Sequence, residues 1–192
     1  DTSTFYRLKM DEYLPRDIDK LLYLDSDIIV DGSIDDLLDT EFNDNELVAA
    51  VECKISTKHL ESINFRGNYY FNAGVIYFDY QKCLRMNIFK KALEELKRSE
   101  DKYIFMDQDV LNIVLKNNVK FISPKWNYST FFAVSELLGK NEIDTEPKII
   151  HYTGIYKPWN YVNINKYSYK YLNYYKELFD EEVKVNDKTL LN

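Results

Sequence analysis

Short apolar runs recur along the chain, and between them the apolar residues take helical spacing. The first run, at residues 21–24, is continuous and stops at Asp25, which is typical of a strand buried on both faces. Four further apolar runs are predicted as strands, at residues 47–51, 74–78, 119–122 and 149–150.

Amphipathic segments separate these runs. Phe89, Ala92, Leu93 and Leu96 recur at positions i, i+3, i+4 and i+7, which predicts a helix over residues 87–98. Other helices are predicted from Ser33, from Asp107, which could be its N-cap, and over residues 168–182. Strands that alternate with helices indicate an α/β domain with a largely parallel sheet, in which ligands bind at the carboxyl ends of the strands.

Length and composition narrow the class of protein. A chain of 192 residues with 45% hydrophobic residues fits a single domain with a real core. Its 25 basic and 32 acidic residues give a net charge of −7, which disfavours a nucleic-acid partner because such proteins need a basic footprint. No run approaches the ~20 apolar residues of a membrane span. Cys53 and Cys83 form no Cys-x-x-Cys pair and are predicted to be buried or half-buried free thiols in a reducing cytoplasm.

Two aspartates follow the first predicted strand, as Asp25-Ser26-Asp27. In an extended segment residues i and i+2 point the same way, so both carboxylates can face one ligand. Two close carboxylates repel each other unless a cation lies between them, and their oxygens suit Mn²⁺ or Mg²⁺. Such an ion can neutralise a diphosphate leaving group. The alternative is a solvated turn, which the apolar residues on both sides make less natural.

A second polar cluster follows the last predicted strand, at residues 151–159. His151 offers a neutral imidazole, which is a good ligand for Mn²⁺. Gly154 allows a ligand to approach the backbone closely, and Lys157 can meet the charge of a phosphate. His151 alone would favour a hydrogen-bonded core histidine, but the combination of imidazole, glycine and cation favours a site.

Four motifs occur in a fixed order along the chain: YLDSD, FNAGV, DQD and HYTGIYKPW, at residues 23–27, 71–75, 107–109 and 151–159. Together they resemble glycosyltransferase family 8, which includes glycogenin and the bacterial lipooligosaccharide galactosyltransferases and lipopolysaccharide glucosyltransferases. The likeness runs from about Thr4 to Trp159. Four ordered motifs are far more specific than any one of them.

The resemblance implies a retaining enzyme with a Rossmann-like nucleotide-diphospho-sugar transferase fold that uses a UDP-sugar and Mn²⁺. The metal ligands that it implies are Asp25, Asp27 and His151. The donor-binding residues that it implies are Arg7, Asp25, Ser26, Asn72, Ala73, Gly154 and Lys157. The catalytic residues that it implies, beside the reacting sugar, are Asp25, Asp107 and Gln108.

Gln108 bears on the mechanism, because the resemblance places it opposite the anomeric carbon. An amide is a poor nucleophile, so front-face attack is favoured over a covalent intermediate. Taken singly, these residues have ordinary explanations: Arg7 as a surface cation, Asn72 as the start of a strand, Asp107 as an N-cap. Only the ordered motifs favour the functional interpretation.

The family opens with a strand and loop that bind the uridine, and this chain begins after that part. The resemblance therefore predicts an N-terminally truncated fold, either a fragment or a reduced descendant. The catalytic domain is predicted over residues 1–165, with a helical Tyr- and Lys-rich tail over residues 166–192. Aromatic and basic residues of the tail could settle at a membrane interface, or the tail could be a packed helix with solvated lysines. These tail residues are Tyr161, Tyr167, Tyr169, Tyr171, Tyr174, Tyr175, Lys166, Lys170 and Lys176.

The predicted function is transfer of glucose or galactose from a UDP-sugar to a hydroxyl of a saccharide or lipid-linked saccharide acceptor of a bacterial surface glycan. The predicted location is the cytoplasm, with peripheral contact at the inner face of the cell membrane. Two alternatives stay open. A metal-dependent phosphatase-like hydrolase would leave residues 151–159 unexplained. A non-catalytic remnant or sugar-nucleotide-binding module is favoured by the missing uridine pocket.

Overall fold

The computed structural model describes residues 2–99, 102–139, 146–155, 157–159 and 167–180. The chain folds into two compact units, each described by itself. Unit 1 comprises Asp1–Leu24 and Asp35–Ser123, and unit 2 comprises Asp25–Ile34 and Pro124–Asn192. The predicted boundary at residue 165 lies outside the described residues, as do Tyr161, Lys166 and Glu182 of the predicted tail.

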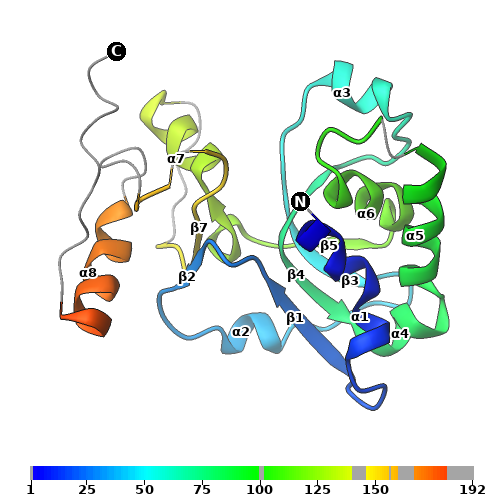
Figure 1. Cartoon of the computed structure of the whole chain (residues 1–192), viewed down its shortest axis with the longest axis horizontal. Coiled ribbons are helices and arrows are strands. Elements are labelled where there is room, and N and C mark those ends of the chain that lie inside the picture. Colours follow the sequence, from blue (N-terminus) through cyan, green and yellow to red (C-terminus); the bar gives the residue numbers. More distant parts are fainter. Residues whose placement is uncertain (1, 100–101, 140–145, 156, 160–166, 181–192) are drawn as a thin grey trace. The chain divides into compact units, whose positions relative to one another are not determined.

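Unit 1 contains a four-stranded sheet in the order β1-β4-β3-β5 (Figure 1). Its strands are β1 (Lys20–Leu24), β3 (Val48–Glu52), β4 (Phe71–Asp79) and β5 (Val119–Phe121). β4 runs antiparallel to both β1 and β3, whereas β5 runs parallel to β3.

Helices surround this sheet. They are η1 (Thr2–Lys9), α1 (Met10–Tyr13), α2 (Asp35–Leu38), α3 (Thr57–Ser62), α4 (Tyr80–Arg85), α5 (Ile88–Ser99) and α6 (Asp107–Leu115). The apolar face predicted for α5 is its buried face, and α5 lies beside α6 (Figure 1). The ring of Phe89 on α5 lies 6.1 Å from that of Phe78 on β4 and 5.9 Å from that of Tyr80 on α4. This contact fastens the helices to the central strand.

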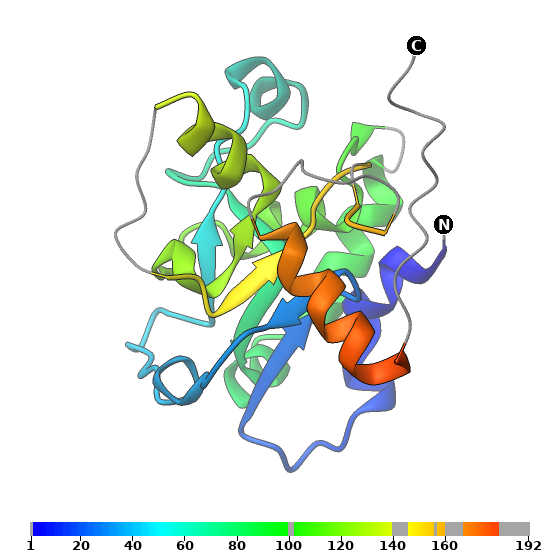
Figure 2. The ribbon, with the colours of Figure 1, turned by 90° about the vertical axis from the view of Figure 1, so that its left-hand side faces the viewer.

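Unit 2 is built around a smaller sheet in the order β2-β7-β6. β2 (Ile28–Val30) runs antiparallel to β7 (Ile149–His151), and β6 (Tyr128–Ser129) runs parallel to it. The other elements of the unit are η3 (Pro124–Trp126), α7 (Thr130–Leu137) and α8 (Ser168–Phe179). In Figure 2, α8 crosses β2 and β7, and the Tyr152 hydroxyl beside β7 donates a 2.9 Å hydrogen bond to the Tyr167 carbonyl at the start of α8.

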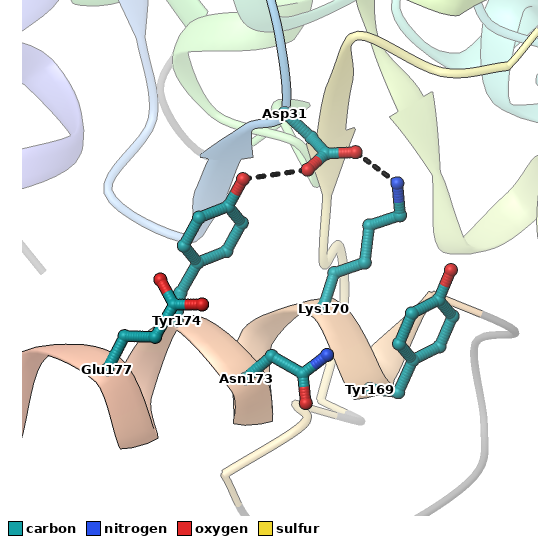
Figure 3. Close-up of a pocket in the computed structure, with 6 residues that line it drawn as sticks. All are labelled: Asp31, Tyr169, Lys170, Asn173, Tyr174 and Glu177. Carbon is teal, nitrogen blue, oxygen red and sulfur yellow. Dashed lines mark hydrogen bonds and ion pairs between the residues drawn. The ribbon is translucent and has the colours of Figure 1, made fainter. Parts of the chain in front are cut away.

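Asp31, just after β2, fastens α8 to the sheet (Figure 3). Its carboxylate pairs with the Lys170 ammonium and accepts a 2.8 Å hydrogen bond from the Tyr174 hydroxyl. Burial alone would raise the pKa of Asp31, but the bonds from Lys170 and Tyr174 outweigh burial and lower that pKa. These bonds lie beside a hollow of about 260 Å³, lined by Asp31, Tyr169, Lys170, Asn173, Tyr174 and Glu177.

The predicted α/β class and all five predicted strands are confirmed, but the prediction of a largely parallel sheet is wrong. The backbone N–H of Cys53, after β3, donates a 2.7 Å hydrogen bond to the carbonyl of Tyr70, before β4. The chain therefore enters β4 at the same end of the sheet at which it leaves β3, and the two neighbouring strands run in opposite directions. Alternation of strands and helices cannot distinguish this arrangement from a crossover.

The two cysteines are free thiols, as predicted: Cys83 is buried and Cys53 is half-buried. Burial raises the pKa of Cys53 to about 11 and that of Cys83 to about 12. Both side chains are therefore protonated near neutral pH and act as packing groups.

Replacing Phe89 by alanine tests the core of unit 1. The side chain is 1% exposed, so Phe89→Ala should lower the free energy of unfolding by about 3–5 kcal/mol, measured by urea denaturation. Lys90→Ala, at the neighbouring exposed position of α5, is the control and should change that free energy by less than about 0.5 kcal/mol. Equal effects of the two substitutions would contradict the packing described.

Candidate functional site

Three candidate metal ligands meet in unit 2. His151 Nε2 lies 3.2 Å from Asp27 Oδ1 and 3.7 Å from Asp25 Oδ2. The ligand atoms that the three residues offer all lie within 4.8 Å of one another. A divalent ion with bonds of about 2.1 Å holds neighbouring ligands about 3 Å apart, so these residues fit such an ion. The sequence predicts this convergence, and the structure brings the three side chains together.

Pairing of β2 with β7 builds this cluster. The register sets Ile28 opposite His151, and the Tyr152 N–H donates a 3.0 Å hydrogen bond to the Asp27 carbonyl. Asp25 directly precedes the turn before β2 and Asp27 belongs to it, so the two residues reach His151 from a turn and not from the extended segment that the sequence suggests. The imidazole is 4% exposed, whereas the carboxylates are 24% and 22% exposed, so the cluster opens to solvent on the carboxylate side.

Asn127, which sequence reasoning missed, orients the imidazole. Its Oδ1 lies 2.9 Å from His151 Nδ1, and the side chain is 1% exposed. With that oxygen as acceptor, Nδ1 carries a proton and Nε2 is directed at the carboxylates, the nitrogen with which a histidine held in this way would bind a metal ion. The one feature of the sequence that could have indicated Asn127 is its position as a polar residue between the aromatic Trp126 and Tyr128, directly before β6.

Lys157 lies against one of these carboxylates, that of Asp27. Its ammonium pairs with Asp27 Oδ2 and donates a hydrogen bond to the Tyr152 carbonyl. Burial alone would raise the pKa of Asp27, but the hydrogen bonds and charges of His151 and Lys157 outweigh burial and hold that pKa well below its usual range. Asp27 is therefore a carboxylate near neutral pH, the form that binds a cation.

Two further predicted donor residues belong to these loops of unit 2. Gly154 has a φ of +79°, a left-handed conformation that a glycine adopts without strain, and a Cβ there would meet open space. Ser26 lies in the turn between the two aspartates with its side chain exposed. Neither residue is one of the three candidate ligands of the cluster.

A second cluster, in unit 1, gathers around the side chain of Gln108 on α6. Gln108 Oε1 accepts hydrogen bonds from the Ala73 N–H at 3.0 Å and from Asn72 Nδ2 at 3.2 Å. Asn72 Oδ1 in turn accepts from the Gly74 N–H at 3.0 Å. The second and third sequence motifs therefore meet through these bonds.

Arg7, which is half-buried, and Asp107, which is buried, form an ion pair in the same unit. The Arg7 guanidinium pairs with Asp107, donates to the Ala73 carbonyl, and lies 4.5 Å from the centroid of the Tyr23 ring. The prediction that Asp107 is the N-cap of α6 is wrong: the N-cap is Met106, with a φ of 47°, and Asp107 is the first helical residue. Its carboxylate is taken by Arg7, which a sequence pattern cannot reveal.

The fold is shared with glycosyltransferases of known structure. The structure of an active-site mutant of LgtC covers 91% of this chain, is 26% identical and has a TM-score of 0.80; the chain covers 66% of it. The galactosyltransferase LgtC in complex with donor and acceptor sugar analogues covers 97% of this chain at 28% identity with a TM-score of 0.78, and the chain covers 69% of it. This likeness confirms the predicted Rossmann-like transferase fold.

The chain belongs to glycosyl transferase family 8, because the model of that family matches residues 1–163. A lipopolysaccharide 1,3-galactosyltransferase of Salmonella typhimurium is 38% identical over an alignment of 168 positions, and the alignment covers 82% of this chain and 49% of the relative. A lipopolysaccharide 1,2-glucosyltransferase of Escherichia coli is 32% identical over 170 residues, 82% of this chain and 50% of the relative. The chain thus spans about half the length of these curated relatives.

Replacing Asn127 by alanine tests the orientation of the imidazole. Because the Nδ1 contact fixes the ring and its tautomer, Asn127→Ala should weaken Mn²⁺ binding by about 10–100-fold, measured by calorimetry. Asn173→Ala, at an exposed position of α8, is the control and should leave the affinity unchanged. Unaltered affinity in Asn127→Ala would show that Asn127 does not position His151.

Proposed function

We propose that the chain is the catalytic part of a retaining hexosyltransferase that moves glucose or galactose from a UDP-sugar to a hydroxyl of a saccharide acceptor. The observation that carries this proposal is the convergence of Asp25, Asp27 and His151 in a member of glycosyl transferase family 8. The names of the two lipopolysaccharide transferases support a hexose donor and a bacterial surface-glycan acceptor. LgtC, solved with donor and acceptor sugar analogues, supports the two kinds of ligand.

The proposed cofactor is Mn²⁺, or Mg²⁺, held by Asp25, Asp27 and His151. A bound divalent ion there would neutralise the charge that develops on a diphosphate leaving group. Lys157 carries a positive charge within reach of the same position, and its bond to Asp27 can be exchanged for a phosphate oxygen. Ser26 and Gly154 leave room for a diphosphate on the exposed side, because Ser26 is exposed and Gly154 carries no side chain.

For the sugar, the proposed residues are those of the second cluster. Gln108, Asn72 and the backbone of Ala73 offer amide donors and acceptors that suit sugar hydroxyls. The Arg7–Asp107 pair braces this cluster through the Ala73 carbonyl, in addition to the donor contact proposed for Arg7. Because the Gln108 amide is a poor nucleophile, the proposed mechanism is front-face attack, with a diphosphate oxygen accepting the proton of the acceptor hydroxyl.

The proposed acceptor is a saccharide or a lipid-linked saccharide, reached at the inner face of the cell membrane from the cytoplasm. Among the helices that the structure describes, none is both long enough and apolar enough to cross a bilayer. Leu178 and Phe179, at the end of α8, are 76% and 59% exposed, and Tyr169 is 52% exposed. An exposed aromatic and aliphatic surface next to basic residues suits peripheral attachment to an anionic lipid surface.

Replacing Asp27 by asparagine tests the metal role. Asp27→Asn removes one negative ligand without changing its size, so donor turnover at saturating Mn²⁺ should fall at least about 100-fold, followed as release of UDP from UDP-glucose and UDP-galactose. Asp44→Asn, an equal change at an exposed position of unit 1, should turn over donor normally. Near-normal turnover by Asp27→Asn would show that Asp27 does not bind the metal ion. If the unaltered chain bound UDP but released no sugar, a sugar-nucleotide-binding module would be favoured instead.

Vesicle co-sedimentation tests the membrane proposal. The double variant Leu178→Ser, Phe179→Ser should bind anionic vesicles at least about 10-fold more weakly than the unaltered chain, because burial of these apolar side chains contributes to interfacial binding. Met86→Ser, at a residue of unit 1 that is 43% exposed, is the control. Equal sedimentation of all three proteins would contradict attachment through α8.

A further inference from the structure

A buried polar network lies behind Gln108, made of Tyr70, Asp109 and His59. Asp109, on α6, is completely buried, and Tyr70 and His59 are 3% and 7% exposed. Asp109 Oδ1 accepts a 2.6 Å hydrogen bond from the Tyr70 hydroxyl and lies 2.8 Å from His59 Nε2. Its Oδ2 accepts a 2.9 Å hydrogen bond from the Phe105 N–H. Three donors thus surround a side chain that, as a carboxylate, can only accept.

This arrangement fixes the direction of the hydrogen bond between Tyr70 and Gln108. The single hydroxyl proton of Tyr70 is donated to Asp109, and burial together with Asp109 raises the pKa of Tyr70 far above its usual value, so the group stays a phenol. Its oxygen can then only accept from Gln108, whose Nε2 lies 3.3 Å away.

The orientation of the Gln108 amide follows. With its NH₂ group turned to Tyr70, its carbonyl oxygen faces the Ala73 N–H and Asn72 Nδ2. A flipped amide would set its NH₂ group against the Ala73 N–H, donor against donor, and would leave the Tyr70 oxygen without a proton to accept. The network therefore selects one of the two amide orientations.

We propose that Tyr70, held by Asp109 and His59, is a positioning residue that keeps the carbonyl oxygen of Gln108 directed at the Asn72–Ala73 segment during sugar transfer. This inference rests on the proposed function, in which Gln108 lies beside the reacting sugar. Tyr70 acts through Gln108 and does not itself touch the substrate.

A nearby contact separates this role from simple packing of α6 against β4. The side chain of Asn112 already ties the two elements together, because its Oδ1 accepts from the Phe71 N–H at 2.8 Å and its Nδ2 donates to the Phe71 carbonyl at 2.9 Å. The hydroxyl of Tyr70 is thus not needed to dock the helix on the strand, and its removal should leave the fold intact.

Tyr70→Phe tests the proposal, with Tyr77→Phe as the matched control. Tyr77 is also a buried tyrosine, and its hydroxyl donates a 2.7 Å hydrogen bond to the Leu38 carbonyl, away from Gln108. In the full chain with Mn²⁺ and UDP-sugar, Tyr70→Phe should lower kcat by about 10–100-fold with the donor KM unchanged, because the reactive geometry is lost but the donor contacts are kept. Tyr77→Phe should keep kcat. Equal losses of kcat in both variants, or a rise in KM in place of the fall in kcat, would overturn the proposal.

A spectroscopic readout decides the orientation independently of turnover. The side-chain ¹H–¹⁵N signals of Gln108, assigned by their loss in Gln108→Ala, should shift and exchange faster with solvent in Tyr70→Phe and stay unchanged in Tyr77→Phe. Asp109→Asn should shift them too, because an amide at residue 109 can donate to the Tyr70 oxygen and release the phenol proton toward Gln108. Unchanged Gln108 signals in Tyr70→Phe would overturn the proposal. If the unaltered chain transferred no sugar, the proposed function would fail, and these signals would still decide whether Tyr70 orients the amide.

Discussion

The mutual repulsion of two neighbouring carboxylates, Asp25 and Asp27, is the constraint that organises unit 2. Pairing of β2 with β7 offsets this repulsion, because it brings two groups that are distant in sequence next to the carboxylates. His151 lies beside both aspartates, and Lys157 pairs with Asp27. The imidazole is held by Asn127 and the ammonium by the Tyr152 carbonyl, so the groups that meet the negative charge are themselves fixed. A divalent ion suits the same position for the same electrostatic reason, since it would draw both carboxylates and the imidazole into one coordination shell.

The three candidate ligands stand out in the sequence because each follows an apolar run that ends abruptly, and the ends of strands are where ligands bind in such sheets. Their partners do not. Asn127 precedes a strand of only two residues, too short to give a periodic pattern, and its role depends on which strand pairs with β7. Asp107 has the ordinary pattern of an N-cap, yet its carboxylate belongs to Arg7, a contact across about a hundred residues that propensity does not encode. The antiparallel direction of β4 could not be predicted for a similar reason. The alternation of strands and helices along the sequence does not show at which end of the sheet the chain enters the next strand.

The two units each hold a polar cluster of different chemistry. Unit 2 gathers charges, and its side chains suit a metal ion and a diphosphate. Unit 1 gathers amides and the ion pair of the half-buried Arg7 with the buried Asp107, and its groups suit neutral hydroxyls. In both, the groups proposed to touch ligand are oriented by buried polar residues: Asn127 behind His151, and Tyr70 with Asp109 behind Gln108. A buried polar side chain without a hydrogen-bond partner is costly. The bonds made by these buried residues therefore favour one orientation of His151 and of Gln108.

Anomalous diffraction from crystals of the chain grown with Mn²⁺ and UDP tests the metal centre most directly. The ligand geometry predicts one manganese peak within about 2.0–2.3 Å of a carboxylate oxygen from each of Asp25 and Asp27 and of His151 Nε2, with Asn127 still bound to Nδ1. A map with no peak at these three side chains, or with the ion bound at a different set of residues, would contradict it.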